Sequence, residues 1–256
     1  MKEQIHTIPI NDALNNAGEC PLCYIKERAF KHTMDFCLGS GASYMESDIR
    51  EMTDTMGFCG YHFKKMFEYG NSLGNAWILK THYKRTIEEM DKQFKKFTPS
   101  KKSFKDKFIK NADTEFSKNS IANWIAKRDE KCFICDSIEK TYRAYLDTLF
   151  YMYVRDPSIK EALKNSRGFC LEHFKDVCIT ADAKLNSEQL KEFYDFMLPL
   201  MEENFKRIYG DISWFIEKFD YRNKDADWKE SKDAIPRGMQ KLSGEYVDHP
   251  NYESKK

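Results

Sequence analysis

Apolar residues recur about once per helical turn along most of this 256-residue chain, which is the pattern of helices with one buried face. Only three valines occur, so the runs of β-branched residues that are typical of strands are missing. The sequence therefore predicts an all-α fold. The pattern predicts helices over residues 12–18, 24–36, 44–55, 62–97, 104–129, 134–154, 158–164, 171–184, 187–220 and 231–242.

Three residues interrupt these helical patterns. Gly70 and Gly74 are expected to break or bend the long segment 62–97, and Pro199 is expected to kink or split the segment 187–220. The segment 98–107, which begins with Thr-Pro-Ser, is the best candidate for a linker between two halves of the chain.

Cysteine and histidine motifs occur twice in the chain in the same order. A CxxC motif at 20–23 is followed by GFCxxHFK at 57–64, and a second CxxC at 132–135 is followed by GFCxxHFK at 168–175. Cys23 and Cys59 are 36 positions apart, and Cys135 and Cys170 are 35 positions apart. This agreement between two otherwise divergent halves predicts an internal duplication.

The repeat gives the expected domain organisation. We expect a first metal-binding helical repeat at 1–98, a basic linker and connecting helix at 99–119, a second repeat at 120–222, and a C-terminal helix with a polar tail at 223–256. The fold expected is a helical bundle built from two similar halves, each with a CxxC…CxxH metal site.

Three thiolates and one imidazole form a complete tetrahedral ligand set for zinc. Since the motifs alternate along the chain, each CxxC is predicted to share an ion with the CxxH that follows it. The predicted ligands are Cys20, Cys23, Cys59 and His62 for one ion, and Cys132, Cys135, Cys170 and His173 for the other. A helix that starts after Gly57 or Gly168 would place its cysteine at a positive helix end, which favours the thiolate.

Other interpretations of the cysteines remain open. Iron–sulfur clusters are the main alternative, because clusters also take thiolate ligands and sometimes histidine. Buried unligated cysteines, or a redox-active CxxC, explain the repeated pattern less well. Cys37 and Cys178 have no counterpart in the other half and are expected to be buried or half-buried thiols. Glu27 and Glu139 do repeat, and could orient the ligand histidines, although such glutamates are more often exposed or paired with a cation.

Composition and charge narrow the function classes. The 42 basic and 41 acidic side chains give a net charge of +1, which disfavours a strongly basic nucleic-acid binder. The longest apolar runs are far too short for a membrane span, and no signal peptide is evident, so we expect a cytoplasmic protein. Lysines and phenylalanines alternate over residues 92–110, but a solvated helix face explains them better than nucleic-acid binding.

The motifs also resemble a known family. The CPLC and GFCxxH sequences, together with the stretch SKDAIPR at 231–237, are similar to an uncharacterised family of cytoplasmic proteins from clostridial-type anaerobes. Members of that family often have the automatic label of ABC transporter substrate-binding protein, which these residues do not support. The resemblance covers nearly the whole chain, and implies the helical plan and two metal sites but no activity.

The sequence leaves the role of the protein open between classes. The first is a zinc-stabilised helical module that binds an unknown protein or small ligand. The second is a metal-handling or iron–sulfur redox protein, and the third is an enzyme with a pocket between the two halves. No phosphate-binding loop, nucleophile elbow or HExxH motif occurs, so no catalytic residue is predicted.

Overall fold

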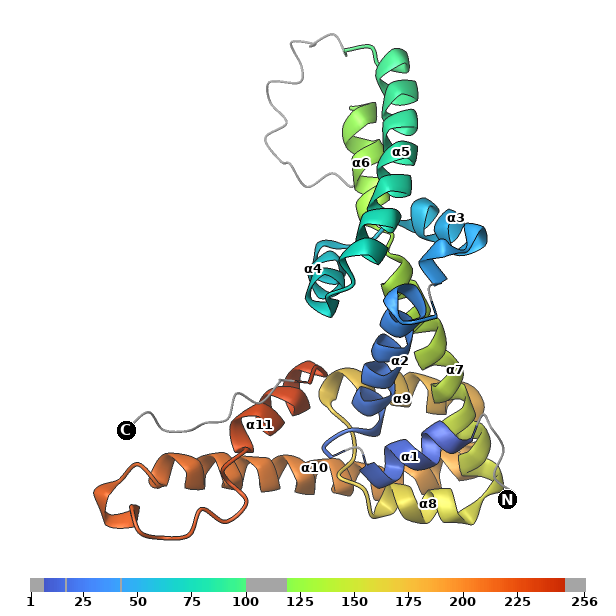
Figure 1. The fold of residues 1–256 in the computed structure, drawn as a ribbon. Helices are drawn as coiled ribbons and strands as arrows, with labels where there is room; N and C mark the ends of the chain where they lie inside the picture. Colours follow the sequence, from blue (N-terminus) through green and yellow to red (C-terminus); the bar gives the residue numbers. More distant parts are fainter. Residues whose placement is uncertain (1–6, 17, 42, 100–118, 247–256) are drawn as a thin grey trace, which may run out of the picture. The chain divides into compact units, whose positions relative to one another are not determined.

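The computed structural model describes residues 7–16, 18–41, 43–99 and 119–246, and over these residues the chain forms 11 α-helices and no strand. The expected all-α fold is therefore confirmed (Figure 1). The helices are α1 (Ile8–Asn16), α2 (Pro21–Leu38), α3 (Ser47–Met56), α4 (Gly60–Tyr69), α5 (Ser72–Lys96), α6 (Ser120–Asp129), α7 (Phe133–Arg155), α8 (Pro157–Lys164), α9 (Leu171–Lys184), α10 (Ser187–Glu217) and α11 (Ala234–Ser243). The predicted helix start near residue 104, most of the linker 99–119 and the end of the polar tail lie outside the described residues.

The chain divides into two compact units. Unit 1 comprises residues 1–29 and 140–256, and unit 2 comprises residues 30–139. The boundary between them falls inside α2 and again inside α7, so each of these helices begins in one unit and ends in the other. These units divide the chain differently from the domains 1–98 and 120–222 that the repeat predicts.

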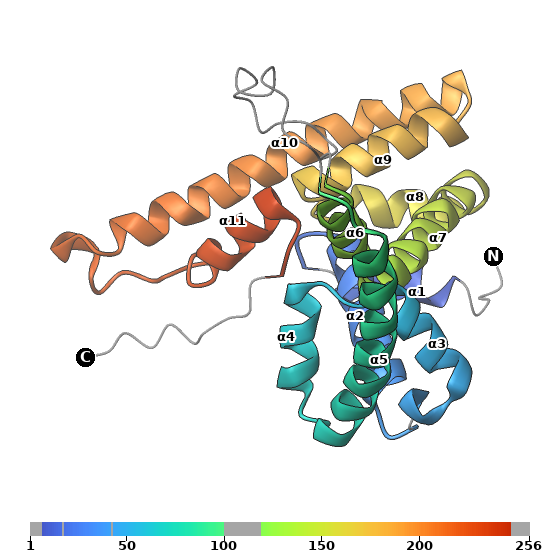
Figure 2. The ribbon, with the colours of Figure 1, turned by 90° about the horizontal axis from the view of Figure 1, so that it is seen from above.

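Unit 1 is built around an aromatic core. Tyr153 of α7 and Phe193 of α10 meet edge to face, with ring centroids 5.5 Å apart, and Phe150 packs 5.7 Å from Phe193. Helices α10 and α11 lie side by side in both views (Figures 1 and 2). The cysteines Cys20, Cys23 and Cys170 belong to the same buried cluster, so a cysteine motif from each half of the chain lies in this core.

Unit 2 has a smaller core in which α3 packs against α5. Met66 of α4 and Ile78 of α5 are buried, and Phe58 contacts Phe133 in an edge-to-face pair with centroids 6.5 Å apart. Cys132 lies in this cluster. The CxxH motif at 59–62 and the CxxC motif at 132–135 thus share the core of unit 2. The CxxC motif at 20–23 and the CxxH motif at 170–173 share the core of unit 1.

Two interruptions of the helical pattern behave differently. Gly70 adopts the left-handed conformation (φ 88°) that ends α4, so the predicted segment 62–97 is two helices. Pro199 lies inside the continuous helix α10 and does not split it. Because proline has no N–H, the carbonyl of Asp195 lacks its usual hydrogen-bond donor at position 199. Asp195 and Pro199 are both exposed, so this carbonyl lies on the solvent side of the helix.

A buried carboxylate organises the charges of unit 1. Glu19 is 1% exposed and forms ion pairs with Arg167 at 3.0 Å, with Arg207, and with Arg237 at 3.4 Å. Lys241 is equally buried, and its Nζ lies 3.8 Å from Glu19 Oε2. Arg237 belongs to the stretch SKDAIPR and also pairs with Asp211 at 3.0 Å. These ion pairs connect the segment before Cys20 to α10 and α11.

No helix among the described residues is both long and apolar enough to cross a lipid bilayer.

Glu19→Gln tests the importance of this buried charge. The amide keeps the volume but removes the charge, which leaves Arg237 and Lys241 buried beside a neutral group. We expect the free energy of unfolding to fall by about 3 kcal/mol in urea denaturation. Glu202→Gln is the control, since its ion pair with Lys206 is exposed and screened by solvent, so its loss should leave the stability nearly unchanged. A loss for Glu19→Gln as small as that of the control would contradict the assignment.

Candidate metal centres

All four cysteine motifs lie at the starts of helices. Cys20 and Cys132 directly precede α2 and α7, while Cys59 and Cys170 are the N-caps of α4 and α9. The last residue of each CxxC or CxxH motif, a cysteine or a histidine, is the third residue of its helix. The free N–H groups and the positive end of each helix stabilise a thiolate there. The helix starts predicted after Gly57 and Gly168 are thus confirmed.

The two CxxH motifs have almost the same backbone. The dihedral angles φ and ψ are −74° and 163° at Cys59, and −74° and 164° at Cys170. The glycines two positions earlier, Gly57 and Gly168, have φ of 64° and 68°, which favours glycine. A Cβ on Gly57 would also lie 2.9 Å from His82 Cε1. The repeated GFC sequence therefore encodes one local structure twice.

The first Cys/His set consists of Cys20, Cys23, Cys170 and His173, all in unit 1. His173 Nδ1 lies 3.5 Å from Cys20 Sγ, 3.4 Å from Cys23 Sγ and 3.1 Å from Cys170 Sγ. The sulfurs of Cys23 and Cys170 are 3.8 Å apart. All four ligand atoms lie within 4.8 Å of one another.

The second Cys/His set consists of Cys59, His62, Cys132 and Cys135, all in unit 2. His62 Nδ1 lies 3.3 Å from Cys59 Sγ, 3.2 Å from Cys132 Sγ and 3.3 Å from Cys135 Sγ. The sulfurs of Cys59 and Cys135 are 4.0 Å apart. The two sets use the same imidazole nitrogen and nearly the same spacings.

The structure brings together all eight residues that the sequence singles out, but the predicted pairing is wrong. Each set takes its CxxC motif from one half of the chain and its CxxH motif from the other. The sequence pairing had put Cys20 and Cys23 with Cys59 and His62, and Cys132 and Cys135 with Cys170 and His173. Each half therefore supplies ligands to both sets.

The path of the chain explains the exchange. Cys23 lies in the first turn of α2, and the next CxxH motif comes only after the remaining length of that helix and α3. Because a helix rises by 1.5 Å per residue, the 18 residues of α2 extend for about 27 Å. The same holds for Cys135 and α7, which has 23 residues. A rigid helix thus separates each CxxC from the CxxH that follows it in the sequence.

The ligand atoms have the spacing that a tetrahedral ion requires. Zinc bond lengths predict about 3.8 Å between two sulfurs and about 3.6 Å between sulfur and nitrogen. The sulfurs of Cys23 and Cys170 are 3.8 Å apart, and those of Cys59 and Cys135 are 4.0 Å apart. The sulfur–nitrogen distances run from 3.1 to 3.5 Å, slightly below the expected value. In each set the four ligand atoms lie within 4.8 Å of one another, so both sets can hold a metal ion.

Burial distinguishes the two sets. In the first set, Cys20, Cys170 and His173 are 0% exposed and Cys23 is 1% exposed. In the second set His62 and Cys132 are buried, but Cys59 is half-buried and Cys135 is exposed. Solvent thus reaches the second set from one side and is excluded from the first.

Without an ion, the thiols of each set influence one another. Burial alone would raise the pKa of Cys20, but hydrogen bonds from Cys170 and Cys23 bring it well below its usual value. Hydrogen bonds with Cys170 and Cys20 raise the pKa of Cys23. In the second set, burial and the neighbouring Cys132 raise the pKa of Cys135 to about 12. A divalent cation removes this competition, because it binds every sulfur as a thiolate.

Both imidazoles pack against aromatic rings. Phe30 stacks on His62 with ring centroids 5.9 Å apart, and Tyr61 meets it edge on at 5.1 Å. Burial lowers the pKa of His62, which favours the neutral ring that a metal needs. The ring of Tyr142 lies 5.3 Å from that of His173. His173 Nε2 is buried and has no hydrogen-bond partner among the residues that the structure describes, so neither Glu27 nor Glu139 orients this histidine through that nitrogen.

Lys241 of α11 links the first set to the charges around Glu19. Its Nζ donates hydrogen bonds to the carbonyls of Glu19, Arg167 and Phe169, which flank Cys20 and Cys170. Burial lowers the pKa of Lys241, while Glu19 and the two cysteines act in the opposite direction. Three thiolates and a divalent ion would have a net charge of −1, so this ammonium would supply a compensating charge in a metal-loaded set.

One of the sequence differences inside the motifs, Pro21 against Phe133, has a structural counterpart. Phe133 of the second CxxC donates its backbone N–H to the carbonyl of Gly57, at 2.9 Å, and so joins the two motifs of the second set. Pro21 occupies the matching position in the first CxxC and has no N–H. The ammonium of Lys241 makes the corresponding link in the first set. Proline does not alter the turn, because α2 begins there as α7 begins at Phe133.

Other candidate sites are weaker. Cys37 is buried and Cys178 is half-buried, as predicted, and burial raises the pKa of both thiols.

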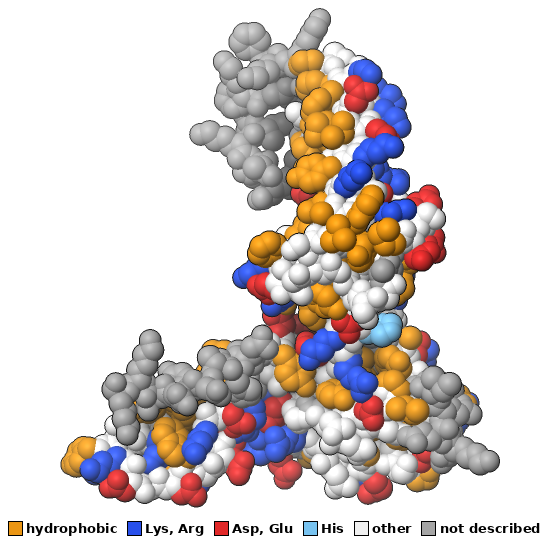
Figure 3. All heavy atoms as spheres, in the orientation of Figure 1, with side chains coloured by type: hydrophobic (Ala, Val, Ile, Leu, Met, Phe, Trp, Pro, Cys, Tyr) orange, Lys and Arg blue, Asp and Glu red, His pale blue; other side chains and the backbone are white. Residues whose placement is uncertain are grey.

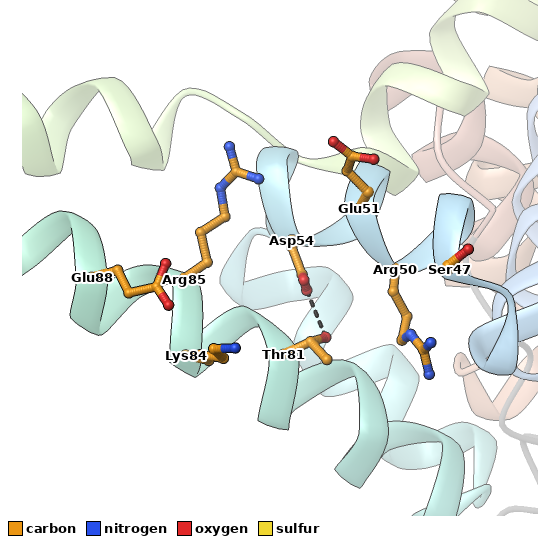
Figure 4. A pocket seen from close by; sticks show the side chains of 8 residues that line it. All are labelled: Ser47, Arg50, Glu51, Asp54, Thr81, Lys84, Arg85 and Glu88. Atoms are coloured by element: carbon orange, nitrogen blue, oxygen red, sulfur yellow. Dashed lines mark hydrogen bonds between the residues drawn. The ribbon is translucent and has the colours of Figure 1, made fainter.

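A groove of about 340 Å³ lies between α3 and α5 of unit 2 (Figure 4). Its lining mixes acidic and basic side chains, and Asp54 already accepts a hydrogen bond from Thr81. Such mixed charges define no ligand class. The groove residues are Ser47, Arg50, Glu51, Asp54, Thr81, Lys84, Arg85 and Glu88.

Comparison with known proteins gives one match. The model of the family of unknown function DUF6062 matches residues 1–249. No curated protein and no solved structure matches the chain. The match covers all eight residues of the two sets.

Multiple replacement tests the pairing of the motifs. A variant without Cys59, His62, Cys132 and Cys135 loses only the second set, so it should still bind one metal ion per chain. A variant without Cys59, His62, Cys20 and Cys23 breaks both sets and should bind none. Metal analysis combined with native mass spectrometry gives the count. If each CxxC shared an ion with the CxxH that follows it in the sequence, the first variant would bind no ion and the second would bind one.

Lys241→Met tests charge compensation at the first set. We expect its affinity for zinc to fall about tenfold, or about 1.4 kcal/mol, in competition with a chelator. Lys218→Met is a matched control, since Lys218 is also buried and donates to the carbonyls of Asn223, Lys224 and Ala226. Both variants should lose stability, and only Lys241→Met should lose zinc affinity. Equal zinc affinity in the two variants would contradict the role of Lys241.

Proposed function

Because the chain belongs to the DUF6062 family, whose function is unknown, we propose its function from its own residues: it is a zinc-binding helical protein in which two ions stabilise the fold. The main support is that three sulfurs and one nitrogen lie within 4.8 Å of one another in each set, which is the spacing of ligands around one tetrahedral ion. A complete set of four protein ligands is typical of structural zinc, whereas catalytic zinc keeps a position open for water or substrate.

The size of each set favours a single ion over an iron–sulfur cluster. A cluster distributes its ligands over two or more iron atoms, which places the sulfurs farther apart than the ligands of one ion. Here all four atoms of each set lie within 4.8 Å of one another. Cysteine with histidine is also a common ligand combination for zinc.

Each ion would connect segments that are distant in the sequence. In the first set, the start of α2 meets the start of α9, with 147 positions between Cys23 and Cys170. In the second set, the start of α4 meets the start of α7, with 76 positions between Cys59 and Cys135. Closing loops of this length restricts the unfolded chain, so metal binding contributes directly to folding.

Exposed apolar side chains support a role as an interaction module. Tyr83, Ile87 and Phe94 are 63%, 59% and 53% exposed, and their spacing places them along one face of α5 (Figure 3). Apolar faces of this kind are typical of protein-binding surfaces. We therefore propose a metal-stabilised scaffold that binds a protein partner, in the cytoplasm, with no catalytic role for the two sets.

Metal analysis of anaerobically purified protein tests the zinc proposal. We expect two zinc ions per chain and a colourless protein. Iron with acid-labile sulfide, or a brown solution, would contradict the proposal. Cobalt substitution should give the visible absorption of a tetrahedral ion with sulfur ligands.

The stabilising role has a separate test. Cys59→Ala should lower the melting temperature by at least ~5 °C, which corresponds to about 2 kcal/mol for a chain of this size. A strong chelator should lower the melting temperature of the wild-type protein as well. Cys178→Ala is the control, since Cys178 is half-buried and outside both sets. An unchanged melting temperature for Cys59→Ala would refute the structural role.

A further inference from the structure

The second Cys/His set differs from the first in one chemically important respect. Cys135 is exposed to solvent and Cys59 is half-buried, whereas no residue of the first set is more than 1% exposed. The ligand types and spacings of the two sets are otherwise the same. A reagent in solution can therefore reach a sulfur of the second set only.

A metal-bound cysteine stays a thiolate, and the thiolate is the nucleophilic form of the side chain. Cys135 in the second set combines this charge state with access to solvent. A second sulfur is also in place, because Cys59 Sγ lies 4.0 Å from Cys135 Sγ. Since a disulfide needs about 2.05 Å, modest movement of these two side chains suffices once the ion leaves.

We propose that Cys135 is a site of oxidative modification, and that the second set is a zinc site sensitive to hydroperoxides while the first is not. The proposal rests on zinc occupancy of both sets. It assigns the two ions different roles: the first is a permanent part of the core of unit 1, and the second is released on oxidation.

The chemistry balances with hydrogen peroxide as the oxidant. The Cys135 thiolate attacks one peroxide oxygen, the O–O bond breaks, and a sulfenic acid forms while hydroxide leaves. A neighbouring thiolate, Cys59 or Cys132, then attacks the sulfur of Cys135, and a second hydroxide leaves as the S–S bond forms. Two protons convert the two hydroxides to water, and the two sulfurs have lost two electrons. Two of the four zinc ligands are gone, so the ion dissociates.

The consequence is confined to the segments that the second set joins. Loss of the ion removes the metal link between the start of α4 and the start of α7. The hydrogen bond from Phe133 N to Gly57 O and the ring contact between Phe58 and Phe133 remain between these two segments. The first set stays closed, because its sulfurs are buried beside Lys241 and the end of α11. Oxidation would thus change unit 2 and leave unit 1 intact.

Zinc release from the zinc-loaded chain tests the proposal. Hydrogen peroxide should release one zinc ion per chain, measured with a colorimetric zinc indicator, while the second ion stays bound. Mass spectrometry of peptides should find Cys135 in a disulfide with Cys59 or Cys132, and all three cysteines of the first set reduced. Release of both ions at the same rate, or oxidation of the first set before the second, would overturn the proposal.

Two matched variants separate chemistry from folding. Cys135→His and Cys23→His each keep four metal ligands and remove the equivalent sulfur from one set. Cys135→His should slow the peroxide-driven release at least tenfold, and Cys23→His should leave its rate unchanged. Equal rates in the two variants would contradict the role of Cys135.

A further measurement needs no variant. N-Ethylmaleimide should label Cys135 of the zinc-loaded wild-type protein before any other of the six motif cysteines, and first labelling at Cys20, Cys23 or Cys170 would refute the proposal. If the purified protein contains no zinc before any treatment, the proposed function is refuted instead. The two failures are therefore distinguishable.

Discussion

Two helix starts meet at each Cys/His set, and this geometry positions the rest of the described structure. An N-terminal turn supplies free N–H groups and a partial positive charge, which is the environment that a cluster of sulfur anions requires. In the first set the turns belong to α2 and α9, and in the second to α4 and α7. Since each helix continues directly from its ligand, fixing four atoms within 4.8 Å also fixes where two helices begin.

The two sets use the same ligands in different surroundings. The first lies in the core of unit 1 and is accompanied by Lys241, whose own charge belongs to the network around Glu19. Burial of an ammonium is costly unless a negative charge or strong acceptors lie near it, and here it has the Glu19 carboxylate and three carbonyls. The second set has no such burial, and Cys135 remains open to water. The surroundings, and not the ligands, distinguish the two centres.

Much of this arrangement could be predicted from sequence. Helical periodicity indicated the fold class, and the repeated motifs indicated all eight ligand-type residues, because thiols and imidazoles at such spacings are rare without a shared role. The pairing of the motifs could not be predicted from the sequence. The two CxxC-to-CxxH separations are nearly equal, and each CxxC forms a complete set of four ligands with either CxxH. The charge compensation by Lys241 was equally out of reach, because a buried lysine has no local signature. The sequence marks this difference only at position 21, where proline has no N–H, whereas Phe133 in the other half has an N–H that donates to the carbonyl of Gly57.

The exchange of motifs between the halves has a consequence for synthesis of the chain on the ribosome. Cys20, Cys23, Cys59 and His62 emerge well before Cys132, so the first four ligand-type residues available to a metal ion are a complete but mispaired set. The second set becomes complete when Cys135 emerges, and the first only with His173. Any ion captured early by the mispaired residues must therefore be given up before α2 and α7 can reach their final partners. Early exposure to zinc thus favours a kinetic trap, and metal supplied to the finished chain avoids it.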